Sequence, residues 1–74
     1  MTEKILVFKG EDVLYIPHQK KIACISGDDC FVITDVPPDT VIGEEADTSL
    51  HFHGYPILAG TELWSDGEKW IIKE

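Results

Sequence analysis

The sequence contains no arginine and only six lysines, against fourteen aspartates and glutamates, so its formal net charge is −8. Arginine reads phosphate groups and guanine through paired hydrogen bonds, and an acidic chain repels the nucleic-acid backbone. The same charge disfavours contact with anionic membrane surfaces. We therefore expect neither direct nucleic-acid binding nor membrane association.

Cysteines and long apolar runs are also scarce. Cys24 and Cys30 are too few for a disulfide framework, and they lack the Cys-x-x-Cys spacing of zinc and redox sites. We expect reduced core cysteines, although a three-residue turn at 26–28 would place them opposite each other and allow a bridge. The apolar run at 5–8 is too short for a signal peptide or a membrane span. The protein is thus expected to be cytoplasmic when synthesised.

Short runs of β-branched and aromatic residues, separated by glycine, proline and aspartate, fill most of the 74 residues. A turn at 9–11 predicts a hairpin between the first two runs, and a glycine at 54 turns the chain after the fifth. No segment has a helical period. The sequence predicts one all-β domain over residues 1–74, a small barrel or sandwich built from a meander of short antiparallel strands. The expected strands cover 4–8, 12–16, 21–26, 30–35 and 49–53, with a short edge strand at 40–42.

The last part of the chain gives the clearest hairpin signal, because Asp66 and Gly67 lie between two β-prone runs. This dipeptide favours a type I′ turn with two loop residues. The resulting register places Trp64 opposite Lys69, and Leu63 opposite Trp70. Alternation then separates a core side from an outer side. The core side holds Leu63, Trp70 and Ile72, and the outer side holds Glu62, Trp64, Lys69 and Ile71.

The first four β-prone runs are apolar at successive positions, so they present apolar side chains on both faces. A chain this short cannot cover both faces of four strands, and each exposed large apolar side chain forgoes roughly 1.5–3 kcal/mol of burial. We therefore expect self-association or docking on a protein partner. Tryptophan is enriched at the centres of such contacts. The predicted interface residues are Trp64, Lys69, Glu62 and Ile71.

The sequence offers little for catalysis or metal binding. His51 and His53 resemble the His-x-His pair of cupins, but the glutamate expected a few residues later is replaced by Ile57 and Leu58. No serine lies in a Gly-x-Ser-x-Gly elbow, and no glycine-rich loop leads into a helix. We expect no catalytic residue, no cofactor and no bound metal. Candidates for a third ligand, if the histidines did hold one, are His18, Glu44, Glu45, Asp47 and Glu62.

One resemblance covers about twenty residues, Gly54-Tyr-Pro-Ile-Leu-Ala-Gly-Thr-Glu-Leu-Trp followed by Ser-Asp-Gly and Trp-Ile-Ile. This stretch resembles the closing segment of small β-rich bacteriophage virion proteins. The resemblance implies a head-decoration, head-tail or tail-associated protein that works by oligomerising and docking in the virion. Two alternatives are a small acidic inhibitor or regulator of a host enzyme and a cupin-like metal-binding protein.

Overall fold

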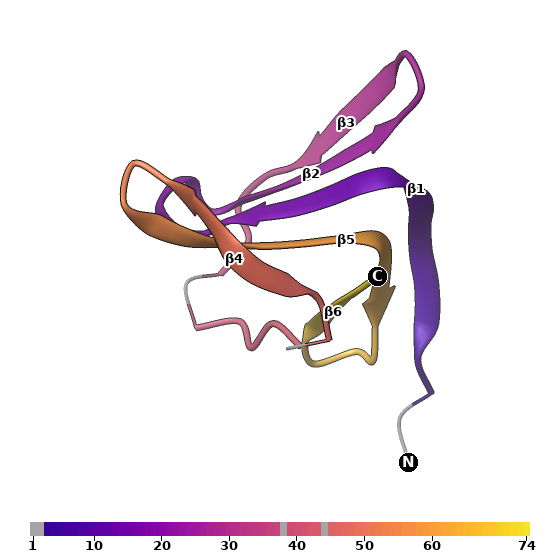
Figure 1. Ribbon diagram of the computed structural model, residues 1–74. Helices are drawn as coiled ribbons and strands as arrows, with labels where there is room; N and C mark the ends of the chain where they lie inside the picture. Colours follow the sequence, from indigo (N-terminus) through magenta and orange to yellow (C-terminus); the bar gives the residue numbers. More distant parts are fainter. Residues whose placement is uncertain (1–2, 38, 44) are drawn as a thin grey trace.

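The computed structural model describes residues 3–37, 39–43 and 45–74, and it confirms the all-β fold (Figure 1). No helix in these residues is long and apolar enough to cross a membrane. A 3-10 turn, η1 (Pro17–Gln19), follows the first strand. The strands are β1 (Ile5–Ile16), β2 (Lys21–Ser26), β3 (Asp29–Ile33), β4 (Asp47–Phe52), β5 (Tyr55–Ser65) and β6 (Trp70–Lys73).

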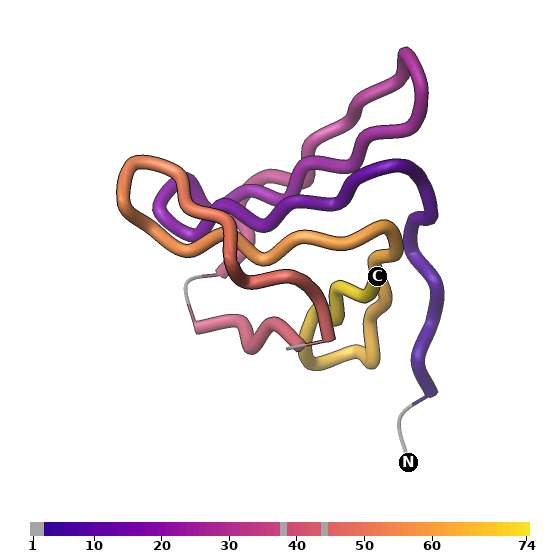
Figure 2. Tube along the Cα trace, in the orientation of Figure 1, coloured from indigo at the N-terminus to yellow at the C-terminus, as the bar shows by residue number. Residues whose placement is uncertain are grey.

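All strand pairs are antiparallel, in the order β3-β2-β1-β5-β4, and β6 pairs with the last part of β5. The two longest strands, β1 and β5, bend and so belong to two parts of the sheet. Their residues 13–15 and 58–60 pair in the large part, whereas 5–9 and 62–65 pair beside β6. Figure 2 shows that the first half of β1 runs at a steep angle to its second half. The bent sheet thereby folds over its own apolar face.

The hairpin predicted at 9–11 is wrong, because β1 continues through these residues as one strand. Its pairing with β5 shifts between Leu6 and Phe8 and again between Lys9 and Val13, which marks β-bulges. At the bend, a Cβ on Gly10 would lie 2.6 Å from the Ile25 carbonyl oxygen of β2. The glycine therefore permits a close approach between β1 and β2 and does not form a hairpin loop.

The β2–β3 hairpin agrees with the predicted turn at Gly27, whose φ is 58°. The loop contains two residues, so Ile25 pairs with Cys30, and Cys24 pairs with Phe31. Cys24 is buried in the core and Cys30 is exposed, and both thiols are free. The register that would have placed the two cysteines opposite each other is not adopted, because the loop is one residue shorter than that register requires.

The connection between β3 and β4 forms no regular strand in its described residues. The predicted edge strand at 40–42 is reduced to single parallel bridges, which join Ile42 to Trp70 and Glu45 to Lys73. The Gly43 N–H donates to the Trp70 carbonyl at 2.8 Å. Pro38 and Glu44 lie outside the described residues. The connection thus covers β6 without extending the sheet.

The last hairpin turns at Asp66 and Gly67 as predicted, but its loop has four residues instead of two. Ser65 pairs with Trp70, and Trp64 pairs with Ile71. The Asp66 carboxylate accepts the N–H groups of Glu68 at 3.0 Å and Lys69 at 2.9 Å, which stabilises the wider loop. The predicted pairing of Trp64 with Lys69 is therefore wrong.

The β4–β5 hairpin turns one residue earlier than expected. His53 and Gly54 both have positive φ, 51° and 84°. These values suit the two central positions of a type I′ turn, and the flanking residues Phe52 and Tyr55 form the last pair of the ladder. His53 therefore belongs to the turn and not to the predicted strand.

The core lies inside the bend, between the large part of the sheet and the β5–β6 hairpin. Leu63 and Ile72 face this core as predicted, and Trp70 packs against it. The same faces result although the register is shifted, because a shift of two residues preserves the alternation. The buried core residues are Val13, Tyr15, Ile22, Cys24, Val36, Leu58, Leu63 and Ile72.

Gly60 marks the bend of β5, and its replacement tests how tightly the end of the chain packs there. A Cβ at Gly60 would collide with the Lys73 carbonyl and lie 2.9 Å from Ile72 Cγ2. We expect Gly60→Ala to lower the free energy of unfolding by about 1–3 kcal/mol, because the backbone must shift to relieve the overlap. Thr61→Ala, at the exposed neighbouring position, serves as the control in urea denaturation. Equal stabilities of the two variants would contradict the close packing.

The loop carboxylate gives a pH prediction. The N–H groups of Glu68 and Lys69 lower the pKa of Asp66. Because its pKa is lower in the folded chain, Asp66 stabilises the fold above its unfolded pKa, and this contribution is lost as the pH falls through the folded value. We expect Asp66→Ala to lower the free energy of unfolding at pH 7 and the difference from wild type to shrink at pH 3. An equal difference at both values in urea titrations would show that the charge plays no part.

Candidate binding surface

The four residues predicted to form an interface are only partly brought together. Glu62 and Trp64 lie on the same face of β5, with Ile71 of β6 opposite Trp64. Ile71 is only 3% exposed, because the connection packs onto it: a Cβ at Gly43 would lie 2.9 Å from Ile71 Cγ2. Lys69 lies in the hairpin loop. The exposed part of the predicted patch therefore centres on Glu62 and Trp64, and Ile71 lies beside Trp64 under the connection.

Trp64 is half-buried and held by polar partners on its own face. Its indole N–H donates to Glu62 Oε1 at 3.0 Å, and Glu62 Oε2 lies 3.6 Å from Lys9 Nζ. The Lys73 ammonium lies 5.5 Å from the centroid of the Trp64 ring, within cation–π range, and 3.3 Å from Glu45 Oε2. The structure thus places Lys73 beside the tryptophan where the sequence predicted Lys69.

These contacts also set the charge state of the patch. The hydrogen bond from Trp64, followed by the attraction of the Lys9 ammonium, lowers the pKa of Glu62. The carboxylate therefore stays ionised to a lower pH than an isolated glutamate. It remains available to accept the indole N–H at neutral pH.

A free strand edge lies beside the Trp64 patch. Leu6 lies in the first half of β1 and pairs with Trp64 of β5. This half of β1 does not pair with β2. Ile5, Leu6 and Val7 are 66%, 43% and 42% exposed. Among the described residues, no strand pairs with the other side of this segment, so its backbone groups face outward.

Most of the exposed large apolar side chains of the described residues lie on strand segments with one unpaired edge. Two further strands, β3 and β4, also have one neighbour each. Seven of the nine exposed large apolar residues lie on these three segments, and the other two are Val41 and Tyr55. The seven are Ile5, Leu6 and Val7 of β1, Phe31 and Val32 of β3, and Leu50 and Phe52 of β4.

An aromatic cluster closes the end of the sheet near η1. The His18 ring stacks on Tyr55 at 4.9 Å and on Phe52 at 5.4 Å between centroids, and it meets His53 edge-on at 6.1 Å. The sequence expected His51 and His53 to share one face, but the left-handed turn turns His53 toward Phe52 and His18. The sequence named His18 as a candidate third metal ligand, but its stacking on Phe52 and Tyr55 was missed because no local pattern links η1 to the β4–β5 turn.

Within residues 3–37, 39–43 and 45–74, no group of three or more histidine, cysteine or acidic side chains is placed to hold a metal ion. The candidate ligand Glu44 lies outside these residues. His18 and His53 meet as aromatic rings, with 6.1 Å between their centroids. The arrangement supplies aromatic stacking, which needs no metal.

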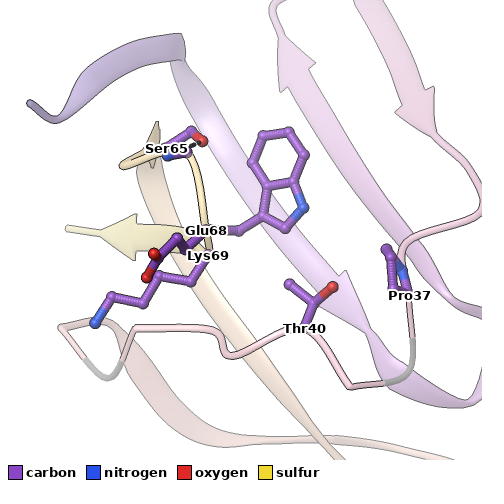
Figure 3. A pocket seen from close by; sticks show the side chains of 7 residues that line it. Pro37, Thr40, Ser65, Glu68 and Lys69 are labelled. Carbon is purple, nitrogen blue, oxygen red and sulfur yellow. Dashed lines mark hydrogen bonds between the residues drawn. The ribbon is translucent and has the colours of Figure 1, made fainter. Parts of the chain in front are cut away.

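The surface of the described residues also has two shallow depressions. One, of about 200 Å³, lies between the connection and the β5–β6 loop (Figure 3). In Figure 3 the Lys69 side chain extends away from Pro37 and Thr40 on the opposite wall. The Ser65 hydroxyl there accepts the Gly67 N–H at 3.2 Å, so it serves the turn.

The second depression, of about 270 Å³, is lined by carboxylates of Asp12, Asp47 and Glu74 together with apolar and small residues. Asp47 Oδ1 accepts the Ser49 N–H at 2.8 Å, and bonding to Ser49 lowers the pKa of Asp47. The apolar strand edges are the more extensive candidate for binding.

The sequence matches no family model, and the searches of curated proteins and of solved structures found no match.

The hydrogen bond between Trp64 and Glu62 can be tested by titration. We expect Trp64→Phe to raise the pKa of Glu62 toward its ordinary value of 4.5, because phenylalanine has no N–H to donate. The carboxyl resonance of Glu62 in NMR spectra reports the titration directly. Trp70→Phe, on the opposite face of the hairpin, is the control and should leave the pKa of Glu62 unchanged. An unchanged value in Trp64→Phe would mean that the indole does not bond to Glu62.

Proposed function

We propose that the chain is a non-catalytic protein-binding module that docks through its free strand edges and the adjoining face with Trp64. It acts as a structural or adaptor subunit, either by self-association or by binding another protein. One observation carries the proposal: the exposed large apolar side chains concentrate on strands with an unpaired edge. An added strand supplies backbone hydrogen bonds to such an edge, and exposed side chains supply apolar contact.

The energetics favour a partner at the first half of β1. Ile5, Leu6 and Val7 are consecutive, so they project on both faces of the edge. Burying such side chains contributes roughly 25 cal/mol for each Å² of apolar surface removed from water. The half-buried Trp64 beside Leu6 adds a rigid aromatic surface of the kind found at the centres of interfaces.

The setting we propose is a bacteriophage particle. The residues that carry the resemblance to phage virion proteins form β5 and the β5–β6 hairpin, which together support both the core and the Trp64 patch. A subunit of such a particle works by docking, which agrees with apolar strand edges. On this proposal the protein is made in the cytoplasm and resides in the virion.

Two substitutions test the docking surface. We expect wild type to form a concentration-dependent oligomer, or a complex with a partner protein, in sedimentation velocity experiments. Trp64→Ala should remain folded and weaken association about thirtyfold, which corresponds to about 2 kcal/mol. Leu6→Lys should also weaken it, because a charge on the edge opposes strand addition. Val41→Lys is the control, because Val41 is 62% exposed but lies outside the strands.

Two results would overturn the proposal. A wild-type protein that stays monomeric at high concentration and binds no protein has no docking function. If Trp64→Ala unfolds and Leu6→Lys associates as wild type does, Trp64 is a core residue and the β1 edge is not a contact.

A further inference from the structure

The large part of the sheet has a second face, on the side away from the core, which we call the back face. Val13 and Tyr15 of β1 point into the core, so Leu14 between them points to the back face. Its partners on both sides, Ala23 of β2 and Ala59 of β5, share that face. The same alternation places apolar residues there on all five strands. They include Leu14, Ile16, Ala23, Ile25, Val32, Leu50, Ile57 and Ala59.

The back face has the composition of a buried surface. An antiparallel sheet with one face in water normally alternates between apolar and polar side chains. Here β1 is apolar at every position over 13–16, and β2 at every position over 22–25. In the described residues, the connection between β3 and β4, with Val36 buried, and the β5–β6 hairpin lie on the core side (Figure 1). Val32 and Leu50, near the two margins of the back face, are 46% and 45% exposed.

The charged groups of the back face are mostly acidic. Asp12 of β1 and Asp47 of β4 hold back-face positions, because they pair with Ile25 and Ala59. Together with Glu74 they line the depression of about 270 Å³ at the end of the face that adjoins the bend of β5. The apolar area therefore ends in three carboxylates.

The neighbouring charges do not neutralise this end. Lys9 and Lys73, the lysines nearest to these carboxylates along the chain, are paired with glutamates of their own. At the far end of the face, Lys20 and Lys21 lie near Asp35, because the N–H of the following residue donates to the Lys20 carbonyl. The back face thus has one acidic end and one end with little net charge. Further acidic residues border the acidic end, and they are Glu11, Asp28 and Asp29.

We propose that the back face binds a different protein, through an apolar surface that carries lysine or arginine side chains at one end. The basic groups then lie at the depression lined by Asp12, Asp47 and Glu74, and the apolar side chains lie along Leu14 and its neighbours. Lysine and arginine suit this position, because their aliphatic stems cover apolar surface while their charged ends reach the carboxylates. This inference goes beyond the docking function proposed above, since it uses another surface and names the chemistry of the partner.

The charges favour a different protein over a second copy. Each copy carries a net charge of −8. Two back faces packed with their strands parallel would bring the acidic ends together, and like charges oppose such a contact. Packed antiparallel, each acidic end would meet an end with too little positive charge to offset it. A basic partner neutralises the acidic end, whereas a nucleic acid or an anionic membrane would be repelled by it.

The width of the back face sets the size of a suitable probe. Five strands spaced about 4.8 Å apart give a face about 20 Å wide, which a helix of about 14 residues spans. The probe is therefore a helical peptide of about 18 residues, with leucines on one side and lysines on the other. A matched peptide has glutamate in place of every lysine. Backbone amide signals of the full chain in NMR spectra report both the affinity and the place of binding.

We expect the lysine peptide to shift the amide signals of Leu14, Ala23 and Ala59, and to bind more weakly as salt is added. The glutamate peptide should leave these signals unchanged. Leu14→Thr should weaken binding of the lysine peptide about fivefold, because it removes apolar contact and keeps a residue that suits a strand. Asp12→Asn should weaken it about threefold, because it removes one of the attracting charges. Dispersed amide signals in the same spectra show that each variant is folded.

Glu68→Gln is the matched control for net charge. It removes the same single negative charge as Asp12→Asn, but in the β5–β6 loop, away from the back face. Glu68→Gln should bind the lysine peptide as wild type does. Equal weakening by both substitutions would mean that the peptide responds only to the total charge, and it would overturn the inference.

The remaining outcomes separate this inference from the docking function. If the lysine peptide does not bind, or both peptides bind equally, the back face does not select a basic partner and the inference is wrong. Signals that move only at residues 5–7 and at Trp64 place binding at the β1 edge, so docking there stands and this inference alone fails. Self-association that Leu14→Thr disrupts and Leu6→Lys does not would make a second copy the occupant, which also overturns it. Binding of the lysine peptide to the back face of a chain whose edge variants change nothing supports this inference and counts against docking through the edges.

Discussion

The fold depends on close backbone contact at the two places where its long strands bend. At Gly10 the β1 strand approaches the Ile25 carbonyl of β2, and at Gly60 the β5 strand approaches the Lys73 carbonyl at the end of β6. A side chain at either position would hold the backbones apart, so both bends need glycine. Because β1 and β5 bend together, their far halves fold over their near halves. Leu63 and Ile72 thereby reach the core that Val13 and Ile22 form from the large part of the sheet.

The same bends create the exposed edge of β1. Before Gly10, the first half of β1 lies apart from β2 and has only β5 as a neighbour, while β2 continues into its hairpin with β3. A strand cannot both stay beside β2 and close the core beside β6. The bend of β1 therefore both closes the core and leaves one edge of its first half unpaired. A short chain has no further segment among its described strands to cover that edge, which favours a second molecule in this role.

The sequence predicted those features that depend on local chemistry. Turn residues located the loops at Gly27 and Asp66, and alternation assigned Leu63 and Ile72 to the core side. Features that depend on distant segments were not predictable in this way. The first two β-prone runs form one strand because β2 and β5 supply their partners, and nothing within residues 4–16 encodes those partners. The four-residue loop at Asp66 forms because its carboxylate binds two loop N–H groups, a choice that the Asp-Gly dipeptide alone leaves open.

In the candidate site, the alternation of side chains along the strands decides which residues share a face. The packing of the connection decides which of them stay exposed. The register of the β5–β6 hairpin differs from the predicted one by two residues, so Glu62, Trp64 and Ile71 remain on one face despite the shift. Because of the shift, the cation beside Trp64 is Lys73 and not the predicted Lys69. The connection between β3 and β4 decides which of these residues are buried. Its Gly43 N–H donates to the Trp70 carbonyl, and Gly43 packs against Ile71. Because Ile71 is buried there, it adds no exposed apolar surface to the predicted patch. The exposed apolar residues next to Trp64 are those of the β1 edge. The proposed point of attachment therefore moves from the outer face of the last hairpin toward the strand beside it.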